Sequence, residues 1–221
     1  MVQARMSSTR LPGKALADVG GEPLLALLLA RLRHARTLDA IVVATSDRPD
    51  DDAIAAAATA LDVSVVRGPL EDVLHRFALA LGDHPGPVVR ITADCPLTDP
   101  ALVDLVVTRF AQTPGARYGS NVEEPRSYPD GLDVEVFTRA ALLDADARAT
   151  TAVEREHVTP LLRADPSGRV AVDSGRALGH LRWTVDTADD LAAVRTLVAR
   201  LGDRRHVAPW EEILALTPSP T

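Results

Sequence analysis

The sequence predicts an α/β fold in which a mixed, mostly parallel sheet lies between two helical layers, a Rossmann-like three-layer sandwich. Short β-branched runs alternate with segments of helical periodicity, and this alternation favours strand–helix–strand units with parallel pairing. The length of 221 residues suits one large α/β domain. We therefore expect a single domain over residues 1–221, in which residues 123–175 form a less regular lobe for acceptor binding or dimerisation.

The first half of the chain supplies most of the expected strands. Only residues 1–3 precede the first polar loop, so the first strand is expected to be very short. Further strands are predicted at residues 40–45 (AIVVAT), 63–66 (VSVV) and 88–92 (VVRIT). Between the last two, apolar residues recur at helical spacing and predict one helix: Leu70, Val73, Leu74, Phe77 and Leu81.

Two later helices begin at capping signals. Asp99 followed by Pro100 is typical of an N-cap and a first helical position. Thr187 with Asp190 three residues on resembles a capping box, which indicates a second helix start. The run at residues 181–185 (LRWTV) directly before it reads as a strand.

Composition disfavours several classes of function. The net charge of -7 and the 3% aromatic content are unfavourable for a protein that binds nucleic acid or an anionic membrane surface. The single cysteine, Cys95, cannot form an internal disulfide, and no signal peptide or membrane-spanning run is apparent. We therefore expect a cytoplasmic protein. Lys14 is the only lysine among the 24 cationic residues.

Residues 4–14 (ARMSSTRLPGK) form the first candidate site. This polar loop carries Arg5, Arg10 and Lys14 together with hydroxyls such as that of Ser8. The loop after the first strand of an α/β sheet lies at the carboxyl edge, where ligands bind, and these groups suit a polyphosphate. The loop is not a GxxxxGK[ST] phosphate loop, and the chain has no GxGxxG. The alternative is a solvated basic N-terminus.

Two aspartates follow predicted strands and form the second candidate site. Asp94 comes just after residues 88–92, and Asp186 holds the same position after residues 181–185. Carboxylates at two strand ends can converge on one crevice and hold Mg²⁺, which proteins bind through one or two carboxylates plus substrate phosphates. The alternative is that each aspartate caps the helix that follows.

A third set of polar residues lies in two later segments, residues 128–137 (YPDGLDVEVF) and residues 154–160 (EREHVTP). In the first, a turn leads into an alternating strand on which Asp133 and Glu135 share one face. These charges either recognise the hydroxyls or carboxylate of an acceptor or pair across a subunit contact. A lone histidine such as His157 is more often a structural hydrogen-bonding group than a catalyst.

These motifs in this order resemble the spore coat polysaccharide biosynthesis protein F family, which belongs among the acylneuraminate and 3-deoxy-manno-octulosonate cytidylyltransferases. The resemblance covers nearly the whole chain and is carried by six segments: ARMSSTRLPGKAL, RGPLEDVLHRF, RITADCPLTDP, SNVEEPRSYPDGLDVEVF, EREHVTP and RWTVDTADDL. It implies a nucleotide-diphospho-sugar transferase fold and a cytidylyltransferase that transfers CMP from CTP to a small acidic acceptor, usually a sugar acid. Pyrophosphate is the expected second product and Mg²⁺ the expected cofactor.

The resemblance also implies roles for individual residues. Arg5, Ser8, Arg10 and Lys14 match the residues that hold the triphosphate, and Arg10, Lys14 and Asp94 are expected to be catalytic. Asp94 and Asp186 match magnesium ligands. A nucleotide-binding role is expected for Arg67, Gly68 and Arg90. The acceptor is expected to contact the following set: Asn121, Tyr128, Asp130, Asp133, Glu135, Arg155, Glu156 and His157. A homodimer formed through the segment after Asn121 is also implied.

Three alternatives stay open at this stage. The enzyme could use another nucleoside triphosphate, or a phosphonate or hydroxy acid as the acceptor. The chain could be a non-catalytic nucleotide-binding homologue. A glycosyltransferase could share the fold, because a fold alone does not decide the chemistry.

Overall fold

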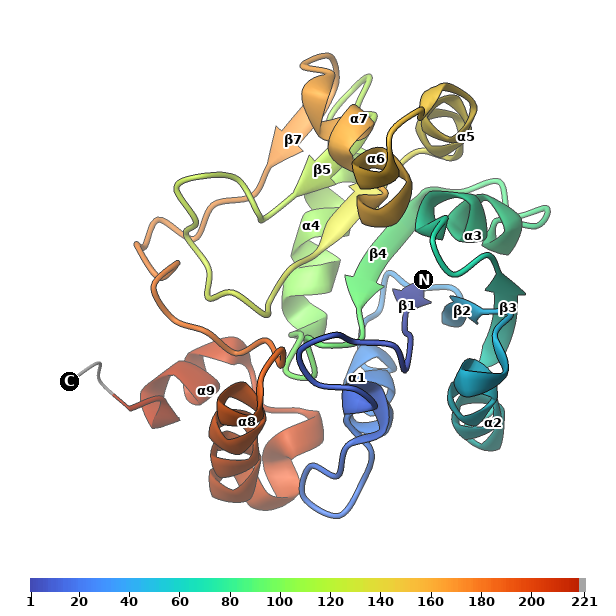
Figure 1. The fold of residues 1–221 in the computed structure, drawn as a ribbon. Helices are drawn as coiled ribbons and strands as arrows, with labels where there is room; N and C mark the ends of the chain where they lie inside the picture. Colours follow the sequence, from blue (N-terminus) through green and yellow to red (C-terminus); the bar gives the residue numbers. More distant parts are fainter. Residues whose placement is uncertain (219–221) are drawn as a thin grey trace.

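The computed structural model describes residues 1–218, which contain a seven-stranded sheet of order β3-β2-β1-β4-β6-β5-β7 (Figure 1). The strands are β1 Val2–Gln3, β2 Val42–Ser46, β3 Ser64–Gly68, β4 Val88–Thr92, β5 Tyr118–Ser120, β6 Glu135–Phe137 and β7 Arg169–Ala171. β6 runs antiparallel to both β4 and β5, whereas the other strand pairs are parallel. The predicted mixed, mostly parallel sheet is confirmed.

Helices cover both faces of this sheet. They are α1 Leu24–Leu32, α2 Asp52–Ala60, α3 Val73–Ala80, α4 Pro100–Gln112, α5 Arg139–Arg148, α6 Ala152–His157, α7 Pro160–Ala164, α8 Ala188–Leu201 and α9 Trp210–Leu216, with 3-10 helices at Lys14–Leu16, Pro49–Asp51 and Gly202–His206. One apolar core holds residues of α1, α2, α4, α8 and α9, and the other holds residues of α3, α5 and α7.

The strands divide their side chains between these two cores. Consecutive residues of one strand fall in different cores, as for Val43 and Ala44 of β2 and for Val88 and Val89 of β4. This is the period-2 alternation of a pleated strand whose two faces are both buried. It explains why the strands read as apolar runs, and it accounts for the three layers.

The capping predictions are confirmed. The Asp99 carboxylate accepts hydrogen bonds from the first-turn amides of α4. Thr187 and Asp190 form the reciprocal capping box that starts α8. The first strand is as short as expected, with the N-terminal ammonium bonded to the Val89 carbonyl at 2.7 Å. Local side-chain chemistry therefore sets these element boundaries.

The strand predicted at residues 181–185 is wrong. Only Arg182 forms an isolated bridge, to Asp130. The amide of Trp183 donates to the Asp130 carbonyl at 2.6 Å, whereas the amide of Val185 donates to the Asp94 carbonyl at 2.8 Å. The segment is extended but bonds two unrelated loops in turn, so no continuous ladder forms. Its apolar residues reflect burial of the segment and not membership of the sheet.

The strand predicted within residues 128–137 is shorter than the sequence pattern indicates. β6 begins at Glu135, so Asp133 lies outside the strand that it was expected to share with Glu135. Before β6, the side-chain amide of Asn121 donates to the Leu132 carbonyl and accepts from the Val134 amide, both at 2.8 Å. A side chain thus replaces the strand partner at this point.

Residues 123–175 contain β6, β7 and helices α5 to α7, and both strands belong to the common sheet. The role of this lobe as an acceptor or dimerisation region stays a prediction.

Within residues 1–218, no helix combines the length and the apolar character needed to cross a membrane.

Candidate functional site

A polar cavity of about 430 Å³ lies where β1 and β4 end, at the carboxyl edge of the parallel part of the sheet. Gln3 and Thr92 line it from the last positions of the two strands. Five cationic and five acidic side chains also line it: Arg5, Arg10, Lys14, Arg76 and Arg90, with Asp94, Asp130, Asp133, Glu156 and Asp186. This size and edge position are typical of ligand sites in α/β proteins.

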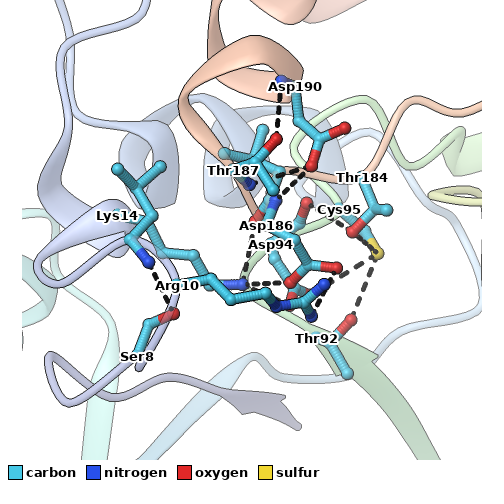
Figure 2. Close-up of polar contacts among 12 residues, drawn as sticks. Ser8, Arg10, Lys14, Thr92, Asp94, Cys95, Thr184, Asp186, Thr187 and Asp190 are labelled. Atoms are coloured by element: carbon cyan, nitrogen blue, oxygen red, sulfur yellow. Dashed lines mark hydrogen bonds and ion pairs between the residues drawn. The ribbon is translucent and has the colours of Figure 1, made fainter.

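The ammonium of Lys14 joins three parts of the chain. Its Nζ donates to Asp94 Oδ2, to Asp186 Oδ1 and to the Val185 carbonyl, each at 2.8 Å (Figure 2). Partial burial lowers the pKa of Lys14, but the two carboxylates outweigh this effect and hold the pKa above its ordinary value. Lys14 is therefore a fixed positive charge, and its side chain is only 13% exposed.

Two further cationic side chains contact the Asp186 carboxylate. Its Oδ2 lies 3.0 Å from a guanidinium nitrogen of Arg10 and 2.6 Å from one of Arg182. Partial burial raises the pKa of Asp186, yet Lys14, Arg182 and Arg10 together hold it below its ordinary value. The backbone amide of Asp186 donates to Asp190 at 2.9 Å, so the Asp190 carboxylate of the α8 capping box also holds the backbone of Asp186. Asp186 is ionised at neutral pH.

The loop at residues 4–14 is held in shape by its own backbone and by one buried acid. The Met6 amide donates to Asp51 Oδ1 at 2.6 Å, and the Gly13 amide donates to the Met6 carbonyl at 2.9 Å. Gly13 has φ 76°, in the left-handed region that favours glycine. The chain then turns directly into the 3-10 helix that begins at Lys14. This turn is what aims Lys14 at the two aspartates.

Asp94 and Asp186 fit a divalent cation of the magnesium type. Their carboxylates both lie within 2.8 Å of one ammonium nitrogen, so they converge on a single point. Hard cations prefer such oxygen ligands. No group of three or more His, Cys, Asp or Glu suited to a metal occurs among residues 1–218. A cation held here would therefore need additional oxygens, such as substrate phosphates.

A second cavity of about 480 Å³ adjoins the first and shares Arg90, Asp133 and His157 with it. Arg126 and Arg163 bring further positive charge to its wall. Burial raises the pKa of Asp133 despite the neighbouring Arg126 guanidinium. The mixture of cations and carboxylates suits a small polar ligand that carries its own negative charge.

Arg90 and Glu135 form a buried ion pair between β4 and β6, beside this second cavity. Glu135 also accepts a hydrogen bond from the Tyr118 hydroxyl at 2.6 Å. Burial raises the pKa of Glu135, but Arg90 and the hydrogen bonds hold it below its ordinary value. Arg90 additionally donates to the Gln3 side chain at 3.0 Å, which fixes the guanidinium at the cavity wall.

Most residues predicted for the site are brought together at these cavities. The first is lined by Arg5, Ser8, Arg10, Lys14, Arg90, Asp94, Asp130, Asp133, Glu156, His157 and Asp186, and Glu135 lines the second. Their individual roles stay predictions. Cys95 also lines the first cavity, but burial raises the pKa of its thiol well above the ordinary value, which disfavours a thiolate.

Two residues predicted to bind the nucleotide are not among those lining either cavity. The Arg67 guanidinium donates to the Ser46 and Arg48 carbonyls and pairs with Asp52 at 2.6 Å. Gly68 ends β3 with its α-carbon against the side chain of Arg76. The structure thus shows other contacts for both, and their nucleotide-binding roles stay predictions.

Three residues predicted to bind the acceptor also lie elsewhere. Tyr128 is buried in the first core, with its ring 5.4 Å from that of Trp210 in an edge-to-face contact. Asn121 is committed to the backbone before β6. Arg155 pairs with Asp146 at 2.6 Å and donates to the Ala149 carbonyl. Charged or polar character in the sequence does not distinguish such internal bonding from ligand binding.

Sequence reasoning missed Arg76, a residue of α3 that lines the first cavity. The available signal is its helical position: Arg76 lies three residues after Val73, beside the apolar face that this helix buries. Thr92 and Thr184, which also line the cavity, carry no distinctive pattern.

The chain is similar to known proteins over its whole length. Residues 1–191 match the family model described as cytidylyltransferase. The chain is similar to the spore coat polysaccharide biosynthesis protein SpsF of Bacillus subtilis strain 168, with 34% identity over 232 residues that cover 100% of this chain and 94% of the relative.

Two solved structures are similar as well. A cytidylyltransferase from Leptospira borgpetersenii superimposes with a TM-score of 0.92 and 28% identity, covering 100% of this chain and 96% of that one. A CMP:2-keto-3-deoxy-manno-octonic acid synthetase complexed with CTP superimposes with a TM-score of 0.67 over 90% of this chain and 97% of that one. At 18% identity, the second similarity shows the fold alone.

Proposed function

The chain belongs to the cytidylyltransferase family, and we propose that it transfers CMP from CTP to an acidic sugar or a similar small acidic acceptor, releasing pyrophosphate. The observation that carries this proposal is the meeting of Lys14, Asp94 and Asp186 beneath the cationic loop at residues 4–14. Fixed cations beside paired carboxylates are the groups that nucleotidyl transfer needs, because the reaction moves negative charge among phosphate oxygens.

In the proposed reaction an acceptor oxygen attacks the α-phosphorus of CTP. The bond from that phosphorus to the oxygen bridging the α- and β-phosphates breaks, and pyrophosphate leaves with the electron pair. Lys14 and Arg10 bind the phosphate oxygens and neutralise the charge that develops there. Positioning of the two substrates supplies most of the remaining effect. When the attacking oxygen belongs to a hydroxyl group, its proton passes to water; a carboxylate oxygen carries no proton and needs no general base.

We place Mg²⁺ on Asp94 and Asp186. The support is the convergence of the two carboxylates and the depressed pKa of Asp186, which keeps it ionised. When bound, the cation supplies additional positive charge to the phosphates. Lys14 bonds both carboxylates. A divalent cation on the two carboxylates would replace these bonds and leave the ammonium available to a phosphate.

We place the acceptor in the second cavity. Its wall contains Arg126, Arg163 and His157, and it opens beside the first cavity through shared residues. The guanidinium groups suit a carboxylate. One structural relative is a synthetase for the CMP derivative of a sugar acid, which supports the same class of acceptor. We further propose that two copies of the chain associate through the lobe at residues 123–175.

The test is a CTP-dependent pyrophosphate-release assay with a panel of sugar acids, hydroxy acids and phosphonates, run with and without Mg²⁺. Lys14→Ala and Asp94→Ala are each expected to lower turnover by a factor of roughly 100 or more, because each removes a charge contact of the transition state. Asp189→Ala is the matched control, since Asp189 is exposed on the first turn of α8 and is expected to leave turnover close to normal.

Several results would contradict the proposal. Near-normal pyrophosphate release from Lys14→Ala or Asp94→Ala would exclude the mechanism. Turnover with UTP, GTP or ATP in place of CTP would reassign the nucleotide. Stabilisation by CTP and Mg²⁺ without turnover on any acceptor would indicate a non-catalytic nucleotide-binding homologue, and turnover only with a nucleotide sugar would indicate a glycosyltransferase.

A further inference from the structure

Two arginines of this protein are almost completely buried, and they differ in what surrounds them. Arg31 is 0% exposed, and its three guanidinium nitrogens donate to the carbonyls of Thr98, Arg205 and Ala208 at 2.6–3.0 Å. Arg76 is 1% exposed, yet its Nε and NH1 have no hydrogen-bond partner among residues 1–218. Each guanidinium nitrogen of Arg31 therefore has a backbone partner, whereas two guanidinium nitrogens of Arg76 have none in the described part of the chain.

A buried guanidinium without partners is unfavourable, because the loss of hydration is not compensated. The acid whose charge acts most strongly on Arg76 is Asp51. Its carboxylate is already engaged by the Met6 amide and by Ser46. Burial lowers the pKa of Arg76, and the like charge of Arg5 lowers it further; together these effects outweigh the opposing charges of Asp51, Asp47 and Asp72. The protein itself therefore leaves this cation under-compensated.

The position of Arg76 indicates which kind of ligand could accept hydrogen bonds from its guanidinium. Arg76 and Val73 line the first cavity from α3, and Glu156 lines it from the neighbouring α6. Arg5 lines the same cavity but already pairs with Glu156 at 2.9 Å. Arg76 thus lines a site where the proposed ligands are anions, and two of its guanidinium nitrogens have no partner among the described residues.

The backbone makes room for this side chain. A Cβ added at Gly68, the last residue of β3, would stand 2.9 Å from the Cγ of Arg76 and 3.0 Å from the Cδ1 of Leu79. Contacts that short require the Arg76 side chain to shift. The absence of a side chain at Gly68 therefore lets the stem of Arg76 lie against β3 while the residue lines the cavity.

From these observations we propose that Arg76 is an oxyanion-binding residue of the first cavity, donating to a phosphate of the nucleotide or to the carboxylate of the acceptor. The planar fork of arginine suits two oxygens of either group. The inference rests on the proposed function only for the identity of these two ligands. The lack of hydrogen-bond partners for Arg76 within residues 1–218 does not depend on which ligand the protein binds.

The first arm of the test needs no ligand. Arg76→Met keeps the length of the stem and removes the buried charge, so the melting temperature of the ligand-free protein is expected to rise by a few degrees. Arg31→Met is the matched control and is expected to lower the melting temperature, because it leaves three carbonyls without their donor. A fall for Arg76→Met as large as that for Arg31→Met would overturn the inference.

The second arm identifies the source of the oxyanion. If Arg76 binds a phosphate, Arg76→Met raises the calorimetric Kd for CTP by about tenfold or more and leaves that for cytidine unchanged. If it binds the acceptor carboxylate, the Kd for CTP stays the same and the KM for the acid acceptor rises by a similar factor. No change in either quantity would overturn the inference.

Two further variants keep the proposal testable if Arg76→Met does not fold. Arg76→Lys keeps the charge without the fork, and Gly68→Ala keeps the guanidinium but displaces its stem. Both are expected to weaken the same ligand as Arg76→Met, by smaller factors. If the wild-type protein neither binds CTP nor releases pyrophosphate, the proposed function fails. The inference is then judged on the melting temperatures and on whether Arg76→Met abolishes stabilisation by inorganic pyrophosphate.

Discussion

Lys14 bonds three oxygens from one nitrogen, an arrangement for which an ammonium is well suited. Its Nζ has three hydrogens, and three acceptors lie at 2.8 Å, one from Asp94, one from Val185 and one from Asp186. A planar guanidinium spreads its donors over a wider fork and is larger. The single lysine of the chain thus stands where arginine, which occupies every other basic position, fits poorly.

We expect Lys14→Arg to lower CTP-dependent pyrophosphate release by about tenfold or more, since misplaced charge is a loss of transition-state stabilisation. Arg10→Lys is the comparison, and we expect a smaller loss because Arg10 is more exposed and makes one ion pair, with Asp186. Circular dichroism establishes that both variants are folded. Turnover of Lys14→Arg within twofold of the wild type would show that charge alone matters at this position.

At the scale of elements, the pairing of β4 with β6 depends on a buried charge. Arg90 lies directly opposite Glu135 in this antiparallel pair, and the two form an ion pair. Tyr118 of β5 adds a hydrogen bond to the same carboxylate at 2.6 Å. Glu135 therefore joins three neighbouring strands, at the edge of the second cavity.

The pH dependence of stability follows from the pKa of Glu135. This pKa is lower in the folded protein than its ordinary value of 4.5, because Arg90 and the hydrogen bonds outweigh burial. The folded state therefore favours the ionised form. The stabilisation is complete above pH 4.5 and is lost as the pH falls through the folded pKa.

We expect Glu135→Gln to lower the free energy of unfolding by about 3 kcal/mol at pH 7, since it leaves Arg90 buried without a counter-charge. The difference from the wild type is expected to shrink as the pH falls below 4.5, which urea titrations at several pH values measure. Glu212→Gln on α9 is the control, because its partner Arg204 is exposed and the pair is expected to contribute little. A difference that stays constant down to pH 3 would contradict the assignment.

At the scale of the whole molecule, the proposed homodimer is expected to form through one surface of the chain. Leu143 of α5 and Val153 of α6 are exposed apolar residues within the lobe at residues 123–175, and Val153 is 60% exposed. Leu79 of the neighbouring α3 is exposed too. Helices α8 and α9 lie at the opposite end of the view from α5 and α6 (Figure 1).

We expect light scattering of the wild type to give the mass of two chains, and Val153→Glu to give 23.5 kDa. The physical reason is that a charge in an apolar contact must be desolvated without a partner. Val207→Glu is the matched control, because Val207 is 47% exposed but lies beside α9, so we expect it to stay dimeric. A concentration-independent monomer in the wild type would remove the proposal.

Agreement between sequence and structure varies with the range of the interactions. The N-cap at Asp99 and the capping box at Thr187 could be predicted because both depend on residues within one helical turn. The strand predicted at residues 181–185 failed because extended, apolar segments look alike whether or not a partner strand is present. Tyr128 was expected at the acceptor but packs on Trp210, a contact that its sequence position does not reveal.

The sequence by itself determined the alternation of strands and helices, the family and the residue types of the cationic loop, because these depend on local pattern and composition. Only the tertiary structure decided which of those residues meet. Lys14 bonds Asp94 and Asp186 across 80 and 172 positions of the chain. It also decided that Arg76, which lines the cavity, has guanidinium nitrogens without a partner among residues 1–218, whereas each guanidinium nitrogen of Arg31 has one. Burial and partners are properties of the packed chain, so two arginines that look equivalent in sequence differ in energy by what surrounds them.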